Sequence, residues 1–88
     1  MSTTTTLDPE QTGRWAVTTD DGVYLVDLNR HRPTLTVNRH SSTTTYDLRF
    51  LISCHIGEPM SFVVHDLDPT SLYCYMQNSH IVRSIRSA

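Results

Sequence analysis

The chain has 88 residues, enough for one small domain and too few for two. Its formal net charge is −2, and all seven basic residues are arginine, so no excess of positive charge points to DNA binding. No stretch has the apolar core of a signal peptide or the length of a transmembrane helix. Together with two cysteines, which we expect to be reduced, these features predict a cytoplasmic protein that does not enter a membrane.

The first twelve residues, MSTTTTLDPEQT, differ in composition from the rest of the chain. They contain four consecutive threonines and only Leu7 as an apolar side chain after the initiator Met. Such a segment buries too little apolar area to offset the entropy lost on ordering. We therefore expect residues 1–12 to form a disordered N-terminal arm and residues 13–88 to form a single β domain.

The stretch RWAVTTDDGVYLVDLN is typical of a β-hairpin. Two alternating apolar runs flank Asp21-Gly22, a pair suited to a two-residue type I′ turn. This turn would place Val17 opposite Val26. It would also gather the apolar side chains on one face, namely Trp15, Val17, Tyr24, Val26 and Leu28.

The remaining segments are also typical of strands separated by turns. Residues 34–39 alternate with Leu35 and Val37 on one side, and residues 40–45 are expected to be a polar loop. Further strands are expected over 46–57, 60–67, 71–77 and 80–86, with turns between them. No segment shows a helical period over ten residues. The pattern predicts an all-β fold, either a small SH3-like barrel or a compact sandwich of about six or seven antiparallel strands.

Two cysteines and two histidines, Cys54, His55, His65 and Cys74, raise the possibility of a zinc site. In the expected register, Phe62 lies between Cys54 and Cys74, so two strand spacings separate the sulfurs by about 10 Å. The core face of this register carries Phe50, Ile52, Cys54, Ile56, Met60, Phe62, Val64, Leu72, Cys74 and Met76. We therefore predict two buried free cysteines, no metal and no cofactor, while a different strand order or a metal shared between subunits stays open.

Patterns typical of enzymes are weak in this chain. Asp66 and Asp68 lie in a turn, but the segment has neither the glycine nor the bidentate glutamate of a calcium loop. With only three glycines, the chain has no nucleophile elbow and no phosphate-binding loop. We therefore expect no enzymatic activity.

The same register defines an outward face on the strands expected over 46–57, 60–67 and 71–77. Its candidate partner-binding residues are Leu51, His55, Val63, His65, Tyr73 and Tyr75. One interpretation is that this face is a second core layer; the other is that it contacts a protein partner or a second copy. Protonation of His55 and His65 would then weaken the contact below about pH 6.5.

Part of the chain resembles a set of small uncharacterised proteins of actinobacteria and their phages. These proteins have a Trp-x-Val-x-Thr opening, a Gly turn, a Tyr-x-x-Asp-Leu return strand and a closing Val-x-Ser-Ile strand. The matching positions here are Trp15, Val17, Thr19, Gly22, Tyr24, Asp27, Leu28, Val82, Ser84 and Ile85. The resemblance covers under half the chain and implies a phage or actinobacterial origin, without implying any catalytic residue.

These observations favour a non-enzymatic protein–protein interaction module, phage-encoded in one interpretation, that binds a host cytosolic protein. A first alternative is a self-assembling structural or accessory protein whose tyrosine-rich face is a homo-oligomer interface, and a homo-oligomer is expected in either case. A second alternative is a single-stranded nucleic-acid binder that uses Arg49, Arg83, Tyr73 and Tyr75, although the net negative charge argues against nucleic acid.

Overall fold

Strands form most of the regular structure in the computed structural model of the chain, which describes residues 3–8, 10–29, 31–39, 42–66 and 74–88. The described strands are β1 (Thr3–Thr4), β2 (Arg14–Thr19), β3 (Gly22–Asp27), β4 (Thr34–Arg39), β5 (Ser42–Ser53), β6 (Pro59–Asp66) and β7 (Cys74–Ser87). The described residues contain no helix, and so none with the length and apolar character needed to cross a bilayer.

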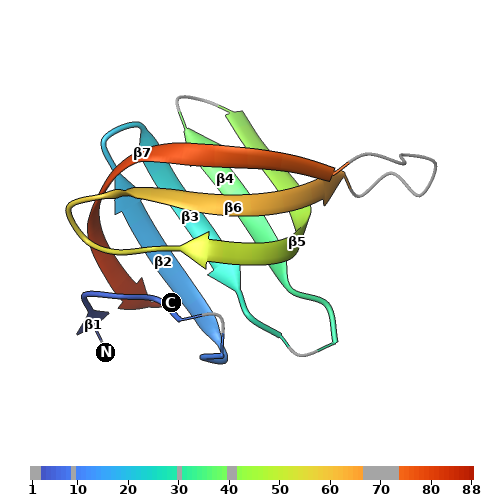
Figure 1. Ribbon diagram of the computed structural model, residues 1–88, viewed down its shortest axis with the longest axis horizontal. Coiled ribbons are helices and arrows are strands. Elements are labelled where there is room, and N and C mark those ends of the chain that lie inside the picture. The colour runs from blue at the N-terminus through green and yellow to red at the C-terminus, as the bar shows by residue number, and fades with distance from the viewer. Residues whose placement is uncertain (1–2, 9, 30, 40–41, 67–73) are drawn as a thin grey trace.

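The strands from β2 to β7 form a closed antiparallel barrel in which each strand pairs with its neighbour in the sequence (Figure 1). β7 closes the ring because it pairs with both β6 and β2. The expected all-β class and strand number are therefore confirmed, and the architecture is a six-stranded barrel rather than a sandwich. Closure removes most of the exposed strand edges that a flat sheet of this size would carry.

β7 is one long bent strand where the sequence suggested two strands with a turn at residues 78–79. Its first half pairs with β6 as far as Ile81, and its second half pairs with β2 from Val82 onward. Buried Ser79 lies at the bend, where its hydroxyl accepts a hydrogen bond from Met60 N (3.0 Å) and donates one to His80 O (2.6 Å). The small polar residues therefore mark a corner of the barrel and not a chain reversal.

The expected β2–β3 hairpin is confirmed, with a small change in register. The two-residue loop is Asp20–Asp21, so Val17 lies opposite Tyr24 and Thr19 opposite Gly22. The pairing thus differs from the expected one by two residues, which leaves every side chain on its expected face. Val17, Tyr24, Val26 and Leu28 are buried accordingly.

β5 begins earlier than expected. Leu35 and Val37 of β4 are buried as predicted, but residues 42–45, expected in a polar loop, belong to β5. They continue the ladder with β4 from Asp47 opposite Thr34 to Ser42 opposite Arg39. The threonines there are compatible with a strand because their β-branched side chains suit an extended backbone.

The N-terminal segment, expected to be disordered, is ordered over Thr3–Asp8. β1 pairs with β7, Thr6 bridges to His55, and Leu7 N donates a hydrogen bond to Cys54 O (2.9 Å). Leu7 is 2% exposed and belongs to the core. Backbone pairing with β7 and with residues 54–56, just after β5, supplies the stabilisation that the threonine-rich composition does not, so the segment packs against the barrel.

The core fills the inside of the barrel. At its centre the rings of Tyr24 and Phe62 meet edge to face, with centroids 6.0 Å apart. This geometry is favourable for aromatic pairs. The buried apolar side chains are Leu7, Val17, Tyr24, Val26, Leu28, Leu35, Val37, Leu48, Leu51, Cys54, Met60, Phe62, Val64, Val82 and Ile85.

Candidate functional site

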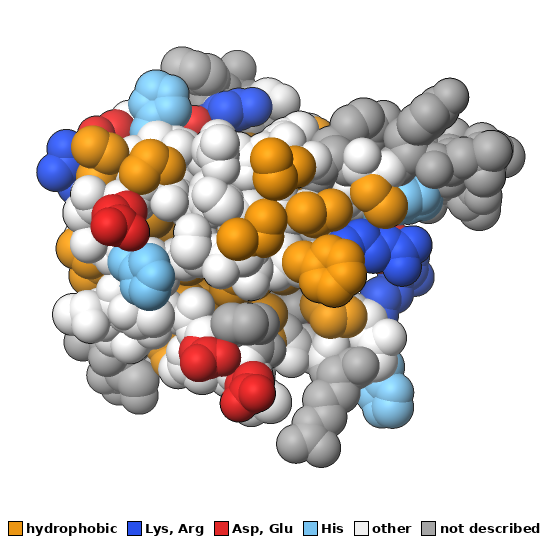
Figure 2. Space-filling view, in the orientation of Figure 1, with side chains coloured by type: hydrophobic (Ala, Val, Ile, Leu, Met, Phe, Trp, Pro, Cys, Tyr) orange, Lys and Arg blue, Asp and Glu red, His pale blue; other side chains and the backbone are white. Residues whose placement is uncertain are grey.

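Apolar side chains gather on the outward face of β5, β6 and β7. Phe50 lies opposite Val63, and Val63 lies opposite Met76, so the three form a row across neighbouring strands. Ile52 adds to this row from β5. Figure 2 shows apolar side chains clustered over these strands. We call the set Phe50, Ile52, Val63 and Met76 the β5–β7 patch.

The patch is well exposed to solvent. Phe50 is 68% exposed, Ile52 54% and Met76 71%, while Val63 is half-buried between its neighbours. Isolated apolar residues are common on protein surfaces, but a continuous row over three strands is not. The patch is therefore the clearest candidate for a contact surface in the described structure.

Two irregularities in β5 explain why Phe50 and Ile52 face solvent. The β5–β6 register shifts between Leu48 and Phe50 and again between Leu51 and Ser53. Each extra residue reverses which side chains face the core. The buried positions of this strand are consequently Leu48 and Leu51, and the same three-residue spacing leads to buried Cys54 just after it.

Among the predicted contact residues, one is buried, and the side chains of two others are not among those that the structure describes. Leu51 is only 6% exposed and belongs to the core, so its prediction as an outward contact residue is wrong. The first β5 bulge is the physical cause, because it turns Leu51 inward. Tyr73 lies outside the described residues, and Tyr75 is described only by its backbone, which pairs with Val64.

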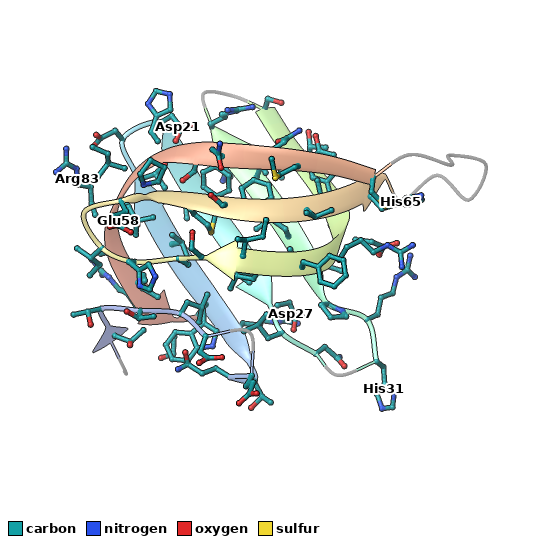
Figure 3. The ribbon with its side chains drawn as sticks, viewed as in Figure 1. Asp21, Asp27, His31, Glu58, His65 and Arg83 are labelled. Carbon is teal, nitrogen blue, oxygen red and sulfur yellow. The ribbon has the colours of Figure 1, made fainter. Side chains whose placement is uncertain are left out.

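The other three predicted contact residues do not form one site. Val63 is in the patch, and half-buried His65 lies at the end of β6, far from Arg83 (Figure 3). His55 follows the end of β5, and its Nδ1 lies 2.9 Å from the Thr6 hydroxyl of the N-terminal segment. Of the predicted contact residues whose side chains the structure describes, Val63 is the one that lies in the patch. The prediction of Phe50, Ile52 and Met76 as core residues is wrong, because all three are exposed.

The rim of the patch is polar and charged. Ser61 Oγ donates to Asn78 Oδ1 (2.6 Å) on the β6–β7 side, and Arg32 pairs with Asp47 (3.1 Å) on the β5 side. Phe50 and Arg49 also line a shallow hollow of about 180 Å³ with Leu28, Pro33, Leu48 and Leu51. An apolar centre with an arginine-containing rim is the usual anatomy of a protein interface.

The cysteines and histidines do not share a metal site. Cys54 is buried, as predicted, whereas Cys74 is exposed opposite His65, which corrects its prediction as a core residue. Among the described residues, no group of three or more His, Cys, Asp or Glu side chains could hold a metal ion. Burial raises the pKa of the Cys54 thiol to about 11, so this side chain behaves as a small core residue.

A second cluster of interacting side chains surrounds the β2–β3 turn. Asp21 accepts hydrogen bonds from Thr19, from Tyr24 (3.1 Å) and from Arg39 (3.2 Å). Partial burial raises the pKa of Asp21, but these donors outweigh it and the pKa is lowered overall. Burial and the Asp21 carboxylate raise the pKa of Tyr24 to about 12. Hydrogen bonds from Thr19, Tyr24 and Arg39 converge on the Asp21 carboxylate, so the cluster stabilises the turn.

Asp20 and Arg83 extend this cluster along β7. The Arg83 guanidinium donates to both carboxylate oxygens of Asp20, at 2.7 and 2.9 Å. This hydrogen bonding holds the pKa of Asp20 below its usual range and raises the pKa of Arg83. Arg83, considered above as a nucleic-acid ligand, is therefore engaged at the turn.

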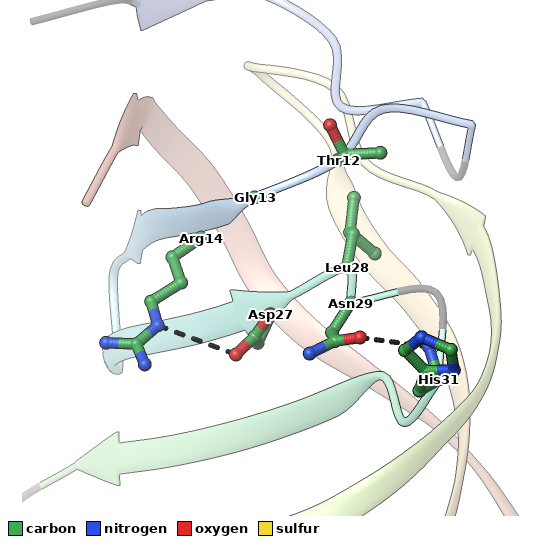
Figure 4. Close-up of a pocket in the computed structure, with 7 residues that line it drawn as sticks. All are labelled: Thr12, Gly13, Arg14, Asp27, Leu28, Asn29 and His31. Carbon is green, nitrogen blue, oxygen red and sulfur yellow. Dashed lines mark hydrogen bonds and ion pairs between the residues drawn. The ribbon is translucent and has the colours of Figure 1, made fainter.

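A wide hollow lies at the other end of the β2–β3 hairpin (Figure 4). It measures about 500 Å³ and is wide open. Arg14 pairs with Asp27 across it (3.5 Å), and Asn29 Oδ1 accepts a hydrogen bond from His31 N (2.9 Å). Its lining is completed by Thr12, Gly13 and Leu28. Its charged and amide side chains are thus engaged with neighbouring groups of the same hollow.

Comparisons with protein-family models, with curated protein sequences and with solved structures gave no match to this chain.

Proposed function

We propose that the chain is a non-enzymatic protein–protein interaction module whose contact surface is the β5–β7 patch. The observation that supports this proposal is the in-register row of Phe50, Val63 and Met76, most of it open to solvent. Each Å² of apolar surface removed from water contributes about 25 cal/mol, so a partner that covers the row gains stabilisation. Phenylalanine, methionine and arginine are all enriched in protein interfaces.

The side chains of the patch suit an apolar partner surface. Met76 is flexible and polarisable, and Phe50 offers an exposed aromatic face, so the two can fit an anchor residue of another protein. The expectation that this partner is a host cytosolic protein follows from the resemblance to phage and actinobacterial chains, and it remains part of this proposal.

The experiment compares two single substitutions that add the same charge at exposed positions. Phe50→Glu lies in the patch, and Leu25→Glu, on β3, replaces a 43% exposed leucine outside it. Tagged proteins would be recovered from cells that make the chain, and the co-purified partner would be purified and titrated by calorimetry. We expect Phe50→Glu to weaken binding at least tenfold, equivalent to about 1.4 kcal/mol, and Leu25→Glu to leave it unchanged.

Equal binding by both variants would contradict the proposal. Circular dichroism and thermal melting would show that both variants fold, which is expected because both positions are exposed.

A further inference from the structure

The first half of β7 is a strand edge that is paired on one side only. Residues 74–78 pair with β6 in an unbroken register, from His65 opposite Cys74 to Ser61 opposite Asn78. β2 joins β7 only from Val82, and β1 pairs only with Ile85 and Arg86. In the described part of the chain, no strand therefore covers the other edge of Cys74–Asn78 (Figure 1).

This edge lacks the features that keep edge strands apart. Cys74, Met76, Gln77 and Asn78 are exposed, and the sequence CYMQN contains neither a charged residue nor a proline. Natural edge strands are usually blocked by lysine, proline or a bulge. The nearest irregularity in β7 comes only after Asn78, where the register with β6 shifts.

The absence of charged residues from Cys74–Asn78 determines which kind of strand can pair with this edge. When a strand pairs with its own copy about a two-fold axis, residues near the axis lie opposite copies of themselves or of close neighbours. A charged residue there would meet a like charge, which is destabilising. The neutral run Cys74–Asn78 meets no such penalty, so it is complementary to itself.

We propose that two copies of this chain associate by antiparallel pairing of β7 with β7 of the second copy, centred on Met76. In this register Met76 lies opposite its own copy, and Cys74 lies opposite Asn78 of the other chain. The two rows formed by Phe50, Val63 and Met76 then meet end to end on one face of a continuous sheet. Contact between the two exposed methionines adds apolar burial to the backbone hydrogen bonds.

The dimer and the protein partner use different surfaces. The dimer forms through the edge of β7, whereas the partner covers the outward face of β5, β6 and β7. Pairing at the edge leaves Phe50 accessible and doubles the length of the apolar row. A dimer would thus present two joined patches to a partner.

Disulfide trapping tests the geometry directly. In a Cys74→Ser background, Met76→Cys should form a disulfide-linked dimer on mild oxidation, because directly opposed residues have Cα atoms about 4.5–5.5 Å apart. Val63→Cys, on the same face but one strand further in, is the matched control. Two Val63 positions would be separated by three strand spacings, about 14 Å, and should not cross-link.

Oligomeric state gives an independent readout on the chain without added cysteines. Sedimentation equilibrium should show a wild-type dimer, and Gln77→Lys should weaken self-association at least tenfold by placing two lysines beside the axis. Gln77 is exposed and outside the patch, so this variant should fold and should still bind the partner lost by Phe50→Glu. Phe50→Glu should conversely remain a dimer.

Three results would overturn the proposal. The first is a wild-type chain that stays monomeric at all concentrations. The second is a dimer that is insensitive to Gln77→Lys, or that cross-links through Val63→Cys as readily as through Met76→Cys. The third is a monomer whose captured partner is released by Gln77→Lys, which would assign the edge to a strand of another protein.

Discussion

The β2–β3 hairpin and the β5–β6 pair have similar alternating sequences and behave differently in the barrel. The hairpin keeps one register from Arg14 opposite Asp27 to Thr19 opposite Gly22. The β5–β6 pair changes register twice within six residues. The alternation of apolar and polar residues therefore identifies the core face of the hairpin correctly and fails to do so in the middle of β5.

The difference follows from the position of each strand in the closed sheet. β2 and β3 are six residues each and lie side by side, so they need little curvature. β5 has twelve residues and pairs with β4 at its start and β6 at its end, so it must bend around the barrel. Bulges supply that bend and increase the local twist, at the cost of a broken alternation.

The largest expected change in stability comes from substituting two phenylalanines on neighbouring strands. Phe62 on β6 is 1% exposed, and Phe50 on β5 faces solvent. We expect Phe62→Ala to lower the free energy of unfolding by about 3–5 kcal/mol, because it leaves a cavity beside Tyr24. Phe50→Ala should change it by less than about 0.5 kcal/mol. Urea titration monitored by circular dichroism measures both, and equal losses would place Phe50 in the core.

Adjacent residues of β5 test the first bulge itself. Leu51→Ala should lower the free energy of unfolding by about 2–5 kcal/mol, whereas Ile52→Ala should change it by less than about 0.5 kcal/mol. The reason is that Leu51 is buried and Ile52 is more than half exposed. An unbroken strand would give the reverse order, since the sequence pattern assigns Ile52 to the core. The same urea titrations therefore decide between the two registers.

The β2–β3 hairpin and β5 also show which parts of the fold could be predicted from the sequence. Asp20, Asp21 and Gly22 mark a local turn, so the hairpin and its buried face followed from neighbouring residues. The need for β5 to bend comes from barrel closure, which depends on the pairing of β7 with both β6 and β2. No short motif around Arg49 or Ile52 signals a bulge, and only the three-residue spacing of Leu48, Leu51 and Cys54 records it afterwards.

The third prediction concerns the N-terminal segment, which is paired to residues 54–56 just after β5. Leu7→Ala should lower the free energy of unfolding by about 2–4 kcal/mol, near the lower part of the range for buried leucines, since a terminal strand can detach locally. Thr5→Ala is the control, because Thr5 is exposed and contributes its carbonyl to Ile56 N (3.0 Å) through backbone alone. Equal stability of the two variants would support a disordered arm.

The hairpin offers a smaller and more local test at its turn. Tyr24→Phe keeps the ring packed on Phe62 and removes the phenol that donates to Asp21 (3.1 Å). We expect a loss of about 1 kcal/mol, because Asp21 retains its hydrogen bonds from Thr19 and Arg39. A loss as large as that of Phe62→Ala would mean that the hydroxyl, and not the ring, stabilises this part of the barrel.

The smallest expected effect is the change of stability with pH, which distinguishes the β2–β3 hairpin from the segment after β5. The Cys54 thiol, in the segment that follows β5, has a pKa of about 11 in the folded chain against 9.0 ordinarily, and burial is the main cause. Its contribution to stability is complete below pH 9 and is lost as pH rises toward 11. Tyr24, whose pKa is raised from 10.0 to about 12, loses its contribution one pH unit higher.

Between pH 8 and pH 9.5 we therefore expect the wild type to lose less than about 1 kcal/mol, nearly all of it through Cys54. Cys54→Ala should lower stability at pH 8 but remove this pH dependence, whereas Tyr24→Phe should keep it. The two variants thus assign the alkaline transition to one region or the other. If Tyr24→Phe abolished the early loss instead, the titrating group would lie at the hairpin turn, and the thiol after β5 would not be shielded from water as its burial requires.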